Sequence, residues 1–302
     1  MIQTIKIGTL RWHYIQDPSD EDLGFLKNNF HFHPLDIEDC KSVNQRPKID
    51  IYDDYYFLIL HFPHYDRWNR FLKTKEVKIF WGKDYIITIG KSHWVVSSLF
   101  NSANEHSDPY EILQVATSDA LLYKILEKLM QETLSLISKL GIELELINRE
   151  LFSKKAEKTI ERISLTRKNI IHLNTIFKPQ LRLFQKFESG QIKGYAEDME
   201  EYWGNILDYY QKMWDMIEDY EELIEGLAKT FDSLQTNRTN EIMKALTIIS
   251  VIILPLTLIA SMYGMNIGLP LQNHPYFFWM LMGFMVALSG FLILLFKKKK
   301  WL

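Results

Sequence analysis

The polar residues with the most regular spacing lie inside a long apolar segment near the C-terminus. No Asp, Glu, Lys or Arg occurs from Ala245 to Phe296, and the first part of this segment contains four regularly placed hydroxyl residues: Thr247, Ser250, Thr257 and Ser261. At about 3.6 residues per turn, their spacing places them on one face of a helix. Neutral hydroxyls of this kind can line a water-filled pore, or they can hold membrane helices together. The spacing alone leaves both interpretations open.

A second candidate for metal chemistry is an acidic stretch before the apolar segment. Residues 196–225 contain eleven Asp or Glu residues and a single base, Lys212. Asp208, Asp215 and Glu222 repeat at intervals of seven, so they share one helix face. If several copies converged, these carboxylates would repel one another unless a cation lay between them. A solvated acidic face is the simpler interpretation, and Asp208 and Asp215 remain candidate ligands of a regulatory cation.

Enzymatic chemistry has no comparable support in the sequence. No His, Ser and Asp set suggests catalysis, and His61 and His64 have no Cys or carboxylate neighbours at metal-binding spacing. Cys40 is the only cysteine, which excludes an intramolecular disulfide and a Cys-based zinc cluster. The net charge is -3, and because residues 297–300 are four lysines, the first 296 residues carry -7. We expect no enzyme, no bound cofactor and no nucleic-acid partner.

The apolar segment divides into two predicted membrane spans. Ala245–Tyr263 has 19 residues and Phe277–Phe296 has 20. Each would extend about 28–30 Å as a helix, which is enough to cross the hydrocarbon core of a lipid bilayer. The four lysines after the second span predict a cytoplasmic C-terminus by the positive-inside rule. Two spans then place the N-terminal part in the cytoplasm as well.

The elements that must position these residues follow in a simple order. Strand-like and short helical patterns in residues 1–108 predict a cytoplasmic α/β domain, and residues 109–194 are helical, with an interruption expected before Pro179. From Ala196 the helical pattern continues without a cap into the first span, roughly 100 Å in all. The predicted parts are therefore residues 1–108, 109–194, a stalk and first span at 195–263, a loop at 264–276, a second span at 277–296 and a basic tail at 297–302.

A motif at the outer end of the first span carries a family resemblance. Tyr263-Gly264-Met265-Asn266, followed by a short loop, a second span and the end KKKKWL, resembles the YGMN motif of the CorA family of magnesium transporters. The blocks HPLDIEDC, QRPKIDIYDDYYF, SDALLYKILEKL and TNEIMKALTIISVIILPLTLIASMYGMN also read like family blocks, so the resemblance covers nearly the whole chain. It implies a homopentameric channel in the cell membrane, with a cytoplasmic funnel, that takes up Mg²⁺ and also Co²⁺ or Ni²⁺.

The resemblance also assigns roles to individual positions along the pore. It implies a selectivity filter at Gly264, Met265 and Asn266, and a pore wall and gate formed by Asn240, Met243, Leu246, Ser250, Leu254, Thr257 and Ser261. In this assignment Asn240 forms a polar ring at the inner mouth, while Met243 and Leu246 form a hydrophobic gate. Mg²⁺ gives up its water reluctantly, so neutral amide and carbonyl oxygens that bind its hydration shell suit it well.

The chain departs from the family pattern at two places. Family members with a cytoplasmic metal site pair a stalk Asp with an Asp on the loop after the sheet. In this sequence the aligned stalk residue is Asn205, and residues 89–100 contain no carboxylate. The outer loop 267–275 also lacks acids, and His274 is its only titratable residue. Two alternatives therefore stay open: a ZntB-like, proton-coupled Zn²⁺ transporter, and a non-conducting membrane-anchored scaffold or sensor.

Overall fold

The computed structural model describes residues 2–43, 45–68, 70–90, 93–106, 108–151, 156–265, 268 and 275–301. Side chains are described for these residues except at positions 156 and 157. The chain divides into two compact units, Met1–Ala228 and Lys229–Leu302. The long helix α7 contributes to both units, which are described separately below.

The first unit is built on a six-stranded sheet with the order β1-β2-β6-β5-β4-β3. Strands β2 and β6 are parallel, and the other neighbouring strands are antiparallel. The longest pair, β4 and β5, forms a hairpin of twelve residues in each strand. The strands are β1 (Ile2–Ile7), β2 (Leu10–Ile15), β3 (Lys48–Ile51), β4 (Tyr55–Asp66), β5 (Phe71–Gly82) and β6 (Tyr85–Ile89).

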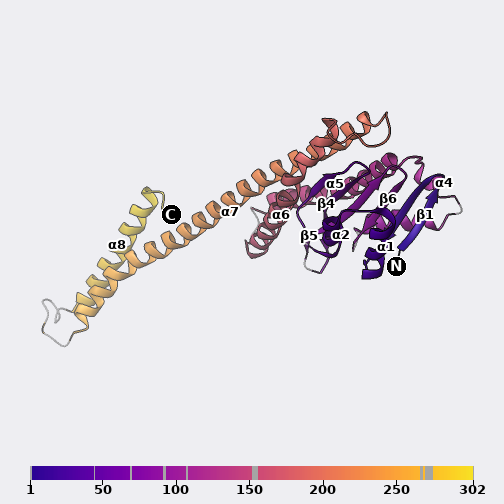
Figure 1. Cartoon of the computed structure of the whole chain (residues 1–302). Helices are drawn as coiled ribbons and strands as arrows, with labels where there is room; N and C mark the ends of the chain where they lie inside the picture. Colours follow the sequence, from indigo (N-terminus) through magenta and orange to yellow (C-terminus); the bar gives the residue numbers. More distant parts are fainter. Residues whose placement is uncertain are drawn as a thin grey trace. The chain divides into compact units, whose positions relative to one another are not determined.

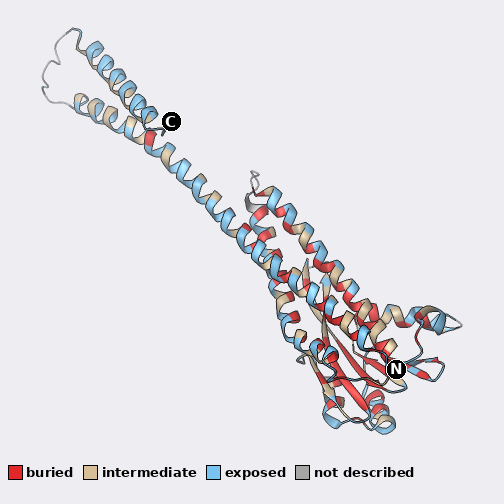
Figure 2. Ribbon diagram, turned by 90° about the horizontal axis from the view of Figure 1, so that it is seen from above, coloured by how far each residue is buried: buried red, intermediate tan, exposed pale blue. Residues whose placement is uncertain are grey.

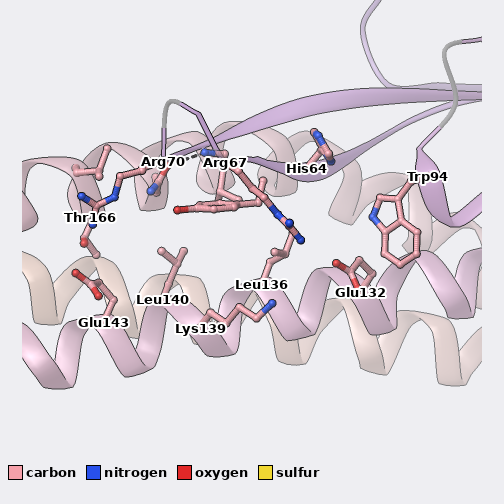
Figure 3. Close-up of a pocket in the computed structure, with 14 residues that line it drawn as sticks. His64, Arg67, Arg70, Trp94, Glu132, Leu136, Lys139, Leu140, Glu143 and Thr166 are labelled. Atoms are coloured by element: carbon pink, nitrogen blue, oxygen red, sulfur yellow. Dashed lines mark hydrogen bonds between the residues drawn. The ribbon is translucent and has the colours of Figure 1, made fainter.

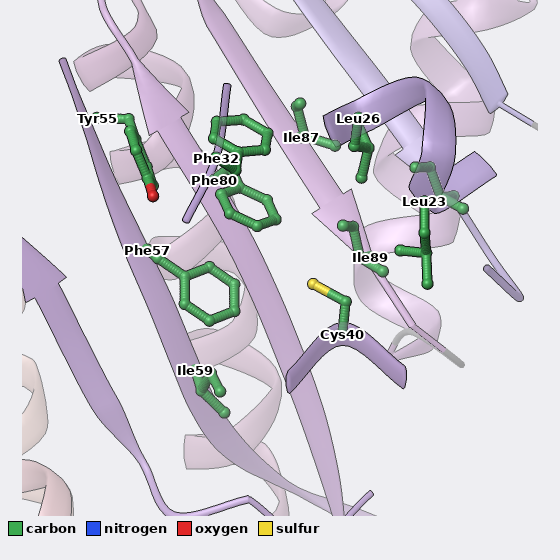
Figure 4. Packing of buried hydrophobic residues seen from close by; sticks show 11 residues of the cluster. Leu23, Leu26, Phe32, Cys40, Tyr55, Phe57, Ile59, Phe80, Ile87 and Ile89 are labelled. Carbon is green, nitrogen blue, oxygen red and sulfur yellow. The ribbon is translucent and has the colours of Figure 1, made fainter. Parts of the chain in front are cut away.

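Helices cover both faces of this sheet, which explains why the first eight residues of β4 read YYFLILHF instead of alternating between apolar and polar. One face packs against the two short helices α1 and α2. Phe57, Phe80 and Ile87 form part of its buried core with Leu26 of α1 and Cys40 of α2 (Figure 4). The other face packs against α5 and α6 (Figure 1). The helices are α1 (Asp20–Phe30), α2 (Pro34–Lys41), α3 (Trp94–Asn104), α4 (Pro109–Leu113), α5 (Ser118–Glu150), α6 (Ala156–Glu188), α7 (Glu200–Tyr263) and α8 (Phe277–Lys298).

The predicted helix interruption before Pro179 is wrong, because α6 continues through this proline. Proline lacks the N–H that would bond the carbonyl of Thr175. The neighbouring turn is held by a side chain instead: the Gln180 amide donates to the Ile176 carbonyl at 3.0 Å and exchanges hydrogen bonds with the backbone of His61 in β4. Tyr210 of α7 also donates to the Phe177 carbonyl at 3.1 Å.

Candidate functional site

The acidic stretch forms the exposed side of α7 in the first unit. Eight apolar or aromatic residues along the opposite side are buried: Trp203, Ile206, Leu207, Tyr210, Met213, Ile217, Ile224 and Leu227. Asp208 and Asp215 are exposed. Among the described residues, no group of three His, Cys, Asp or Glu side chains could hold a metal ion. Asn205, which we expect at the position of the family's stalk Asp, donates a hydrogen bond to the Tyr123 hydroxyl at 2.7 Å.

In the second unit, α8 returns antiparallel along the end of α7 (Figure 2). The rings of Tyr263 and Phe277 pack with centroids 4.9 Å apart at the loop end. At the other end, the Lys244 ammonium donates to the Lys300 carbonyl at 3.2 Å and lies 5.8 Å from the centre of the Trp301 ring. Both helices are long and apolar enough to cross a membrane. In the most apolar 18-residue stretch of each helix, only 6% of α7 and none of α8 is buried within the chain. Lipid or other protein chains must cover them.

The predicted pore positions form one stripe on α7. At roughly 100° per residue, the seven residues from Asn240 to Ser261 fall within about 120° of the helix surface. Ile248 and Ile259, which are buried or half-buried, project to the opposite side of the helix. The stripe residues are exposed except for the half-buried Ser250, and Leu254 is 66% exposed. The second unit therefore leaves this face of α7 free.

Two hydroxyl groups of the stripe, those of Ser250 and Thr257, are bonded to their own helix. Ser250 Oγ donates to the Leu246 carbonyl at 2.9 Å, and Thr257 Oγ1 donates to the Ile253 carbonyl at 3.0 Å. A hydroxyl has one proton and two lone pairs. Because the protons are used within the helix, Ser250 and Thr257 present only hydrogen-bond acceptors to their surroundings. Such a surface suits the outward-pointing hydrogens of a hydrated cation.

The end of α7 is consistent with the predicted span boundary. The helix ends at Tyr263, and the Gly264 N–H closes the last turn by donating to the Ala260 carbonyl at 2.9 Å. A Cβ atom at Gly264 would lie 3.3 Å from that carbonyl oxygen, so the position is tight. Asn266, the predicted filter residue, and His274 lie outside the described residues.

Comparison with known proteins identifies the family. The family described as CorA-like Mg²⁺ transporter protein matches residues 8–298. The chain belongs to this family. Two similar proteins are the putative metal ion transporter YfjQ of Bacillus subtilis and the cobalt/magnesium transport protein CorA of Thermotoga maritima. YfjQ is 29% identical over 99% of this chain and 93% of its own length, and the Thermotoga protein is 26% identical over 90% of this chain and 78% of its own length.

A solved structure shows that the fold is also shared. The CorA magnesium transporter of Methanocaldococcus jannaschii superimposes with a TM-score of 0.83 over 99% of this chain and 94% of its own, at 22% identity. The predicted order of an α/β domain, a long stalk helix and C-terminal apolar helices is therefore confirmed. This CorA-like chain is a membrane protein of a divalent metal-ion transporter family and not an enzyme.

Sequence reasoning missed Lys244 in this CorA-like chain. This lysine connects the cytoplasmic end of the first apolar span to the basic tail through Lys300 and Trp301. Its position directly before the uncharged segment could have marked it in the sequence, because lysines are enriched at the cytoplasmic ends of membrane spans. The contact with the tail could not be read from the sequence, since the partners are 56 residues apart.

Proposed function

We propose that several copies of this chain, five by family resemblance, assemble around a central axis and conduct hydrated Mg²⁺ into the cytoplasm. The observation that carries the proposal is the free stripe on α7, which lies away from α8. A two-span chain cannot enclose a pore alone, so each copy contributes one helix face to the wall. In this arrangement α8 lies outside α7, towards the lipid.

The stripe alternates between two kinds of surface. Ser250 and Thr257 offer acceptor oxygens to the ion's hydration shell, while Met243, Leu246 and Leu254 are exposed apolar side chains. Rings of such apolar groups close a pore by expelling water when they approach one another. We assign the gate to Met243 and Leu246, a further constriction to Leu254, and the polar wall to the hydroxyl residues, including Ser261.

The ends of the pore are assigned by the resemblance. Asn240 forms the inner polar ring, and Gly264, Met265 and Asn266 form the outer filter, in which amide and carbonyl oxygens bind the hydrated ion. Both chain termini lie in the cytoplasm. A divalent cation that moves inward across about 100 mV gains about 4.6 kcal/mol, so the membrane potential is sufficient to drive uptake.

Cysteine scanning tests the pore stripe. The native thiol of Cys40 should react poorly, because it is buried and burial raises its pKa to about 12. A Cys40→Ser background removes this thiol altogether. In that background we expect a charged thiol reagent to block Mg²⁺ flux through Ser250→Cys and Thr257→Cys channels in liposomes. Ile259→Cys, on the opposite side of the helix, is the matched control and should not be blocked. Equal sensitivity of all three variants would exclude the stripe as the pore wall.

Flux measurements separate the proposed function from its alternatives. Liposomes receive Mg²⁺, Co²⁺, Ni²⁺ or Zn²⁺, each with and without a pH gradient. We expect potential-driven Mg²⁺ uptake that Asn266→Ala abolishes. Zn²⁺ uptake that requires the pH gradient would instead favour the ZntB-like alternative. The absence of Asp and Glu from residues 267–275 is consistent with that alternative. A folded protein that transports none of these ions would support the scaffold or sensor.

Regulation by cytoplasmic Mg²⁺ is assigned to the acidic side of α7. Asp208 and Asp215 are exposed there, so carboxylates of neighbouring copies could share an ion. If so, the Asp208→Asn/Asp215→Asn double variant should require a higher Mg²⁺ concentration for inhibition of flux. The Glu161→Gln/Glu188→Gln double variant, at two exposed positions of α6, loses the same two charges and serves as the charge-matched control. Unchanged inhibition in the double variant would remove both residues from regulation.

A further inference from the structure

The first unit contains a cavity that the transport function does not use. It has a volume of about 710 Å³ and lies between the turn that joins β4 to β5, the start of α3, and helices α5 and α6 (Figure 3). Pockets for small molecules range over roughly 300–1,000 Å³. The cavity is therefore large enough for a small organic ligand.

Three cationic side chains line the cavity without a carboxylate partner. Arg67 and Arg70 come from the β4–β5 turn, and Lys139 comes from α5. In the described part of the chain, none of the three has a carboxylate oxygen within 4.0 Å. Glu143, which also lines the cavity, is already bound to the Arg162 guanidinium at 2.7 Å. The cavity therefore has an excess of positive charge that favours an anion, and paired Arg side chains suit phosphate oxygens in particular.

Two buried polar side chains of α6 form part of the cavity wall. Thr166 and Asn169 are only 3% and 4% exposed. The Leu72 N–H donates to Asn169 Oδ1 at 2.9 Å, which fixes the orientation of the amide and leaves its nitrogen as an available donor. Neither this nitrogen nor the Thr166 hydroxyl has a protein partner among the described residues. Both residues line the cavity, so the two groups can hydrogen-bond a molecule bound there.

The opposite end of the cavity has a different chemistry. Figure 3 shows Trp94 and Glu132 at one end, Arg70 and Thr166 at the other, and Arg67 with Lys139 between them. The Trp94 indole is 50% exposed and offers a flat apolar surface. Glu132 has no ion-pair partner within the described ranges. A planar ring with an amino group could therefore stack on Trp94 and donate a hydrogen bond to Glu132.

We propose that this cavity binds a nucleoside polyphosphate. The base stacks on Trp94 and its exocyclic amino group donates to Glu132, while the phosphates extend past Arg67 and Lys139 towards Arg70. Stacking of a base on an aromatic side chain is a recurrent and favourable contact. An inorganic anion would use only the cationic part of the cavity, whereas a nucleotide also uses the indole and the carboxylate.

Binding to the full-length protein in detergent tests the proposal. Isothermal titration calorimetry is performed with ATP, adenosine and tripolyphosphate, first in EDTA and then with Mg²⁺. We expect ATP to bind one site per chain, and adenosine or tripolyphosphate to bind at least about tenfold more weakly. Arg67→Gln and Lys139→Gln should each weaken ATP binding about tenfold or more, since charged hydrogen bonds are lost. Trp94→Ala should weaken the binding of ATP without changing the binding of tripolyphosphate.

Arg182→Gln is the matched control, because Arg182 is an exposed arginine of α6 outside the cavity lining. It should bind ATP as the unmodified protein does, and all variants should keep their unfolding temperature. The absence of saturable binding at millimolar ATP would overturn the proposal. Equal affinity for ATP and tripolyphosphate would also overturn it. A third contradicting result would be no nucleotide binding together with a loss of oligomer mass in the Arg67 and Lys139 variants, which would identify the cavity as a contact between copies of the chain.

Discussion

The connection that leads into α7 depends on a glycine that no other residue can replace without strain. Gly194 has φ +70°, and a Cβ atom there would overlap Asp119 Oδ1 and lie 3.0 Å from the Trp81 ring. Asp119 and Trp81 are 1% and 0% exposed, so neither can move aside easily. Asp119 Oδ1 also accepts the Tyr195 N–H at 2.8 Å. Gly194→Ala should therefore disturb the anchoring of the stalk helix to the α/β layer.

The expected loss of stability has two parts. A left-handed backbone costs an L-residue about 1–2 kcal/mol, and displacement of the Asp119 carboxylate sacrifices a charge-assisted hydrogen bond of about 1.5–3 kcal/mol. Gly194→Ala should thus reduce the free energy of unfolding by about 3–5 kcal/mol. Gly190 also has φ +70°, but nothing lies within 4 Å of its added Cβ. Gly190→Ala should therefore lose only about 1–2 kcal/mol.

Thermal unfolding of the full-length protein in detergent measures both effects. A unit of 228 residues loses about 2–4 °C of Tm for each kcal/mol. We expect Gly194→Ala to lower Tm by about 6–20 °C, and Gly190→Ala by about 2–8 °C. Combining Gly194→Ala with Asp119→Ala should be less damaging than the two single losses together, because the two residues share one contact. Equal Tm losses for the two glycine variants would refute the steric argument.

Three further predictions concern acidity, packing and the gate. Burial lowers the pKa of His13 and of His93 to about 4 from 6.5, so the unfolded chain takes up protons that the folded chain does not; stability should fall as the pH drops from about 6.5 towards 4, by up to about 3 kcal/mol for each histidine. His93→Gln should flatten this fall in a Tm series across pH, and an unchanged slope would contradict the assignment. Gly141→Ala should displace the Tyr220 ring, which its new methyl group would overlap, and Tyr220→Leu in the same chain should restore Tm; a neutral single variant would show that the contact is loose. Leu246→Asn should raise resting Mg²⁺ flux in liposomes, because a polar ring no longer expels water, whereas flux at the unmodified level would exclude Leu246 from the gate.

Local patterns predicted where the first apolar helix ends and where the second begins. The end of α7 at Tyr263 and the start of α8 at Phe277 coincide with the predicted span limits. Both limits follow from the apolar composition and from the punctuation by Gly and Pro, which are properties of the sequence nearby. The stalk begins at Glu200, four residues later than predicted. Helix starts without a strong cap are difficult to place from sequence because several positions have a similar free energy.

Features that depend on distant residues could not be predicted. Pro179 is a local helix breaker, and the contacts that compensate for it come from His61 and Tyr210, 118 and 31 positions away in the sequence. The cavity in the first unit likewise combines Arg67, Trp94, Lys139 and Asn169 from four separate elements. No spacing rule connects such residues, so only the folded chain shows them together.

The polar stripe on α7 gains its chemical character from the helix that carries it. Thr247 donates its proton to the Met243 carbonyl at 2.8 Å, as Ser250 and Thr257 do to theirs. Pro255 adds to the same effect, because it has no N–H to give to the carbonyl of Val251, which lies at the edge of the stripe. The hydroxyl protons on this face are therefore engaged within the helix, and the Val251 carbonyl adds a free hydrogen-bond acceptor. In the proposed pore, a face of this kind would attract the water hydrogens of a hydrated cation and offer an anion few donors, so a cation preference would follow from neutral residues, without a carboxylate in the span.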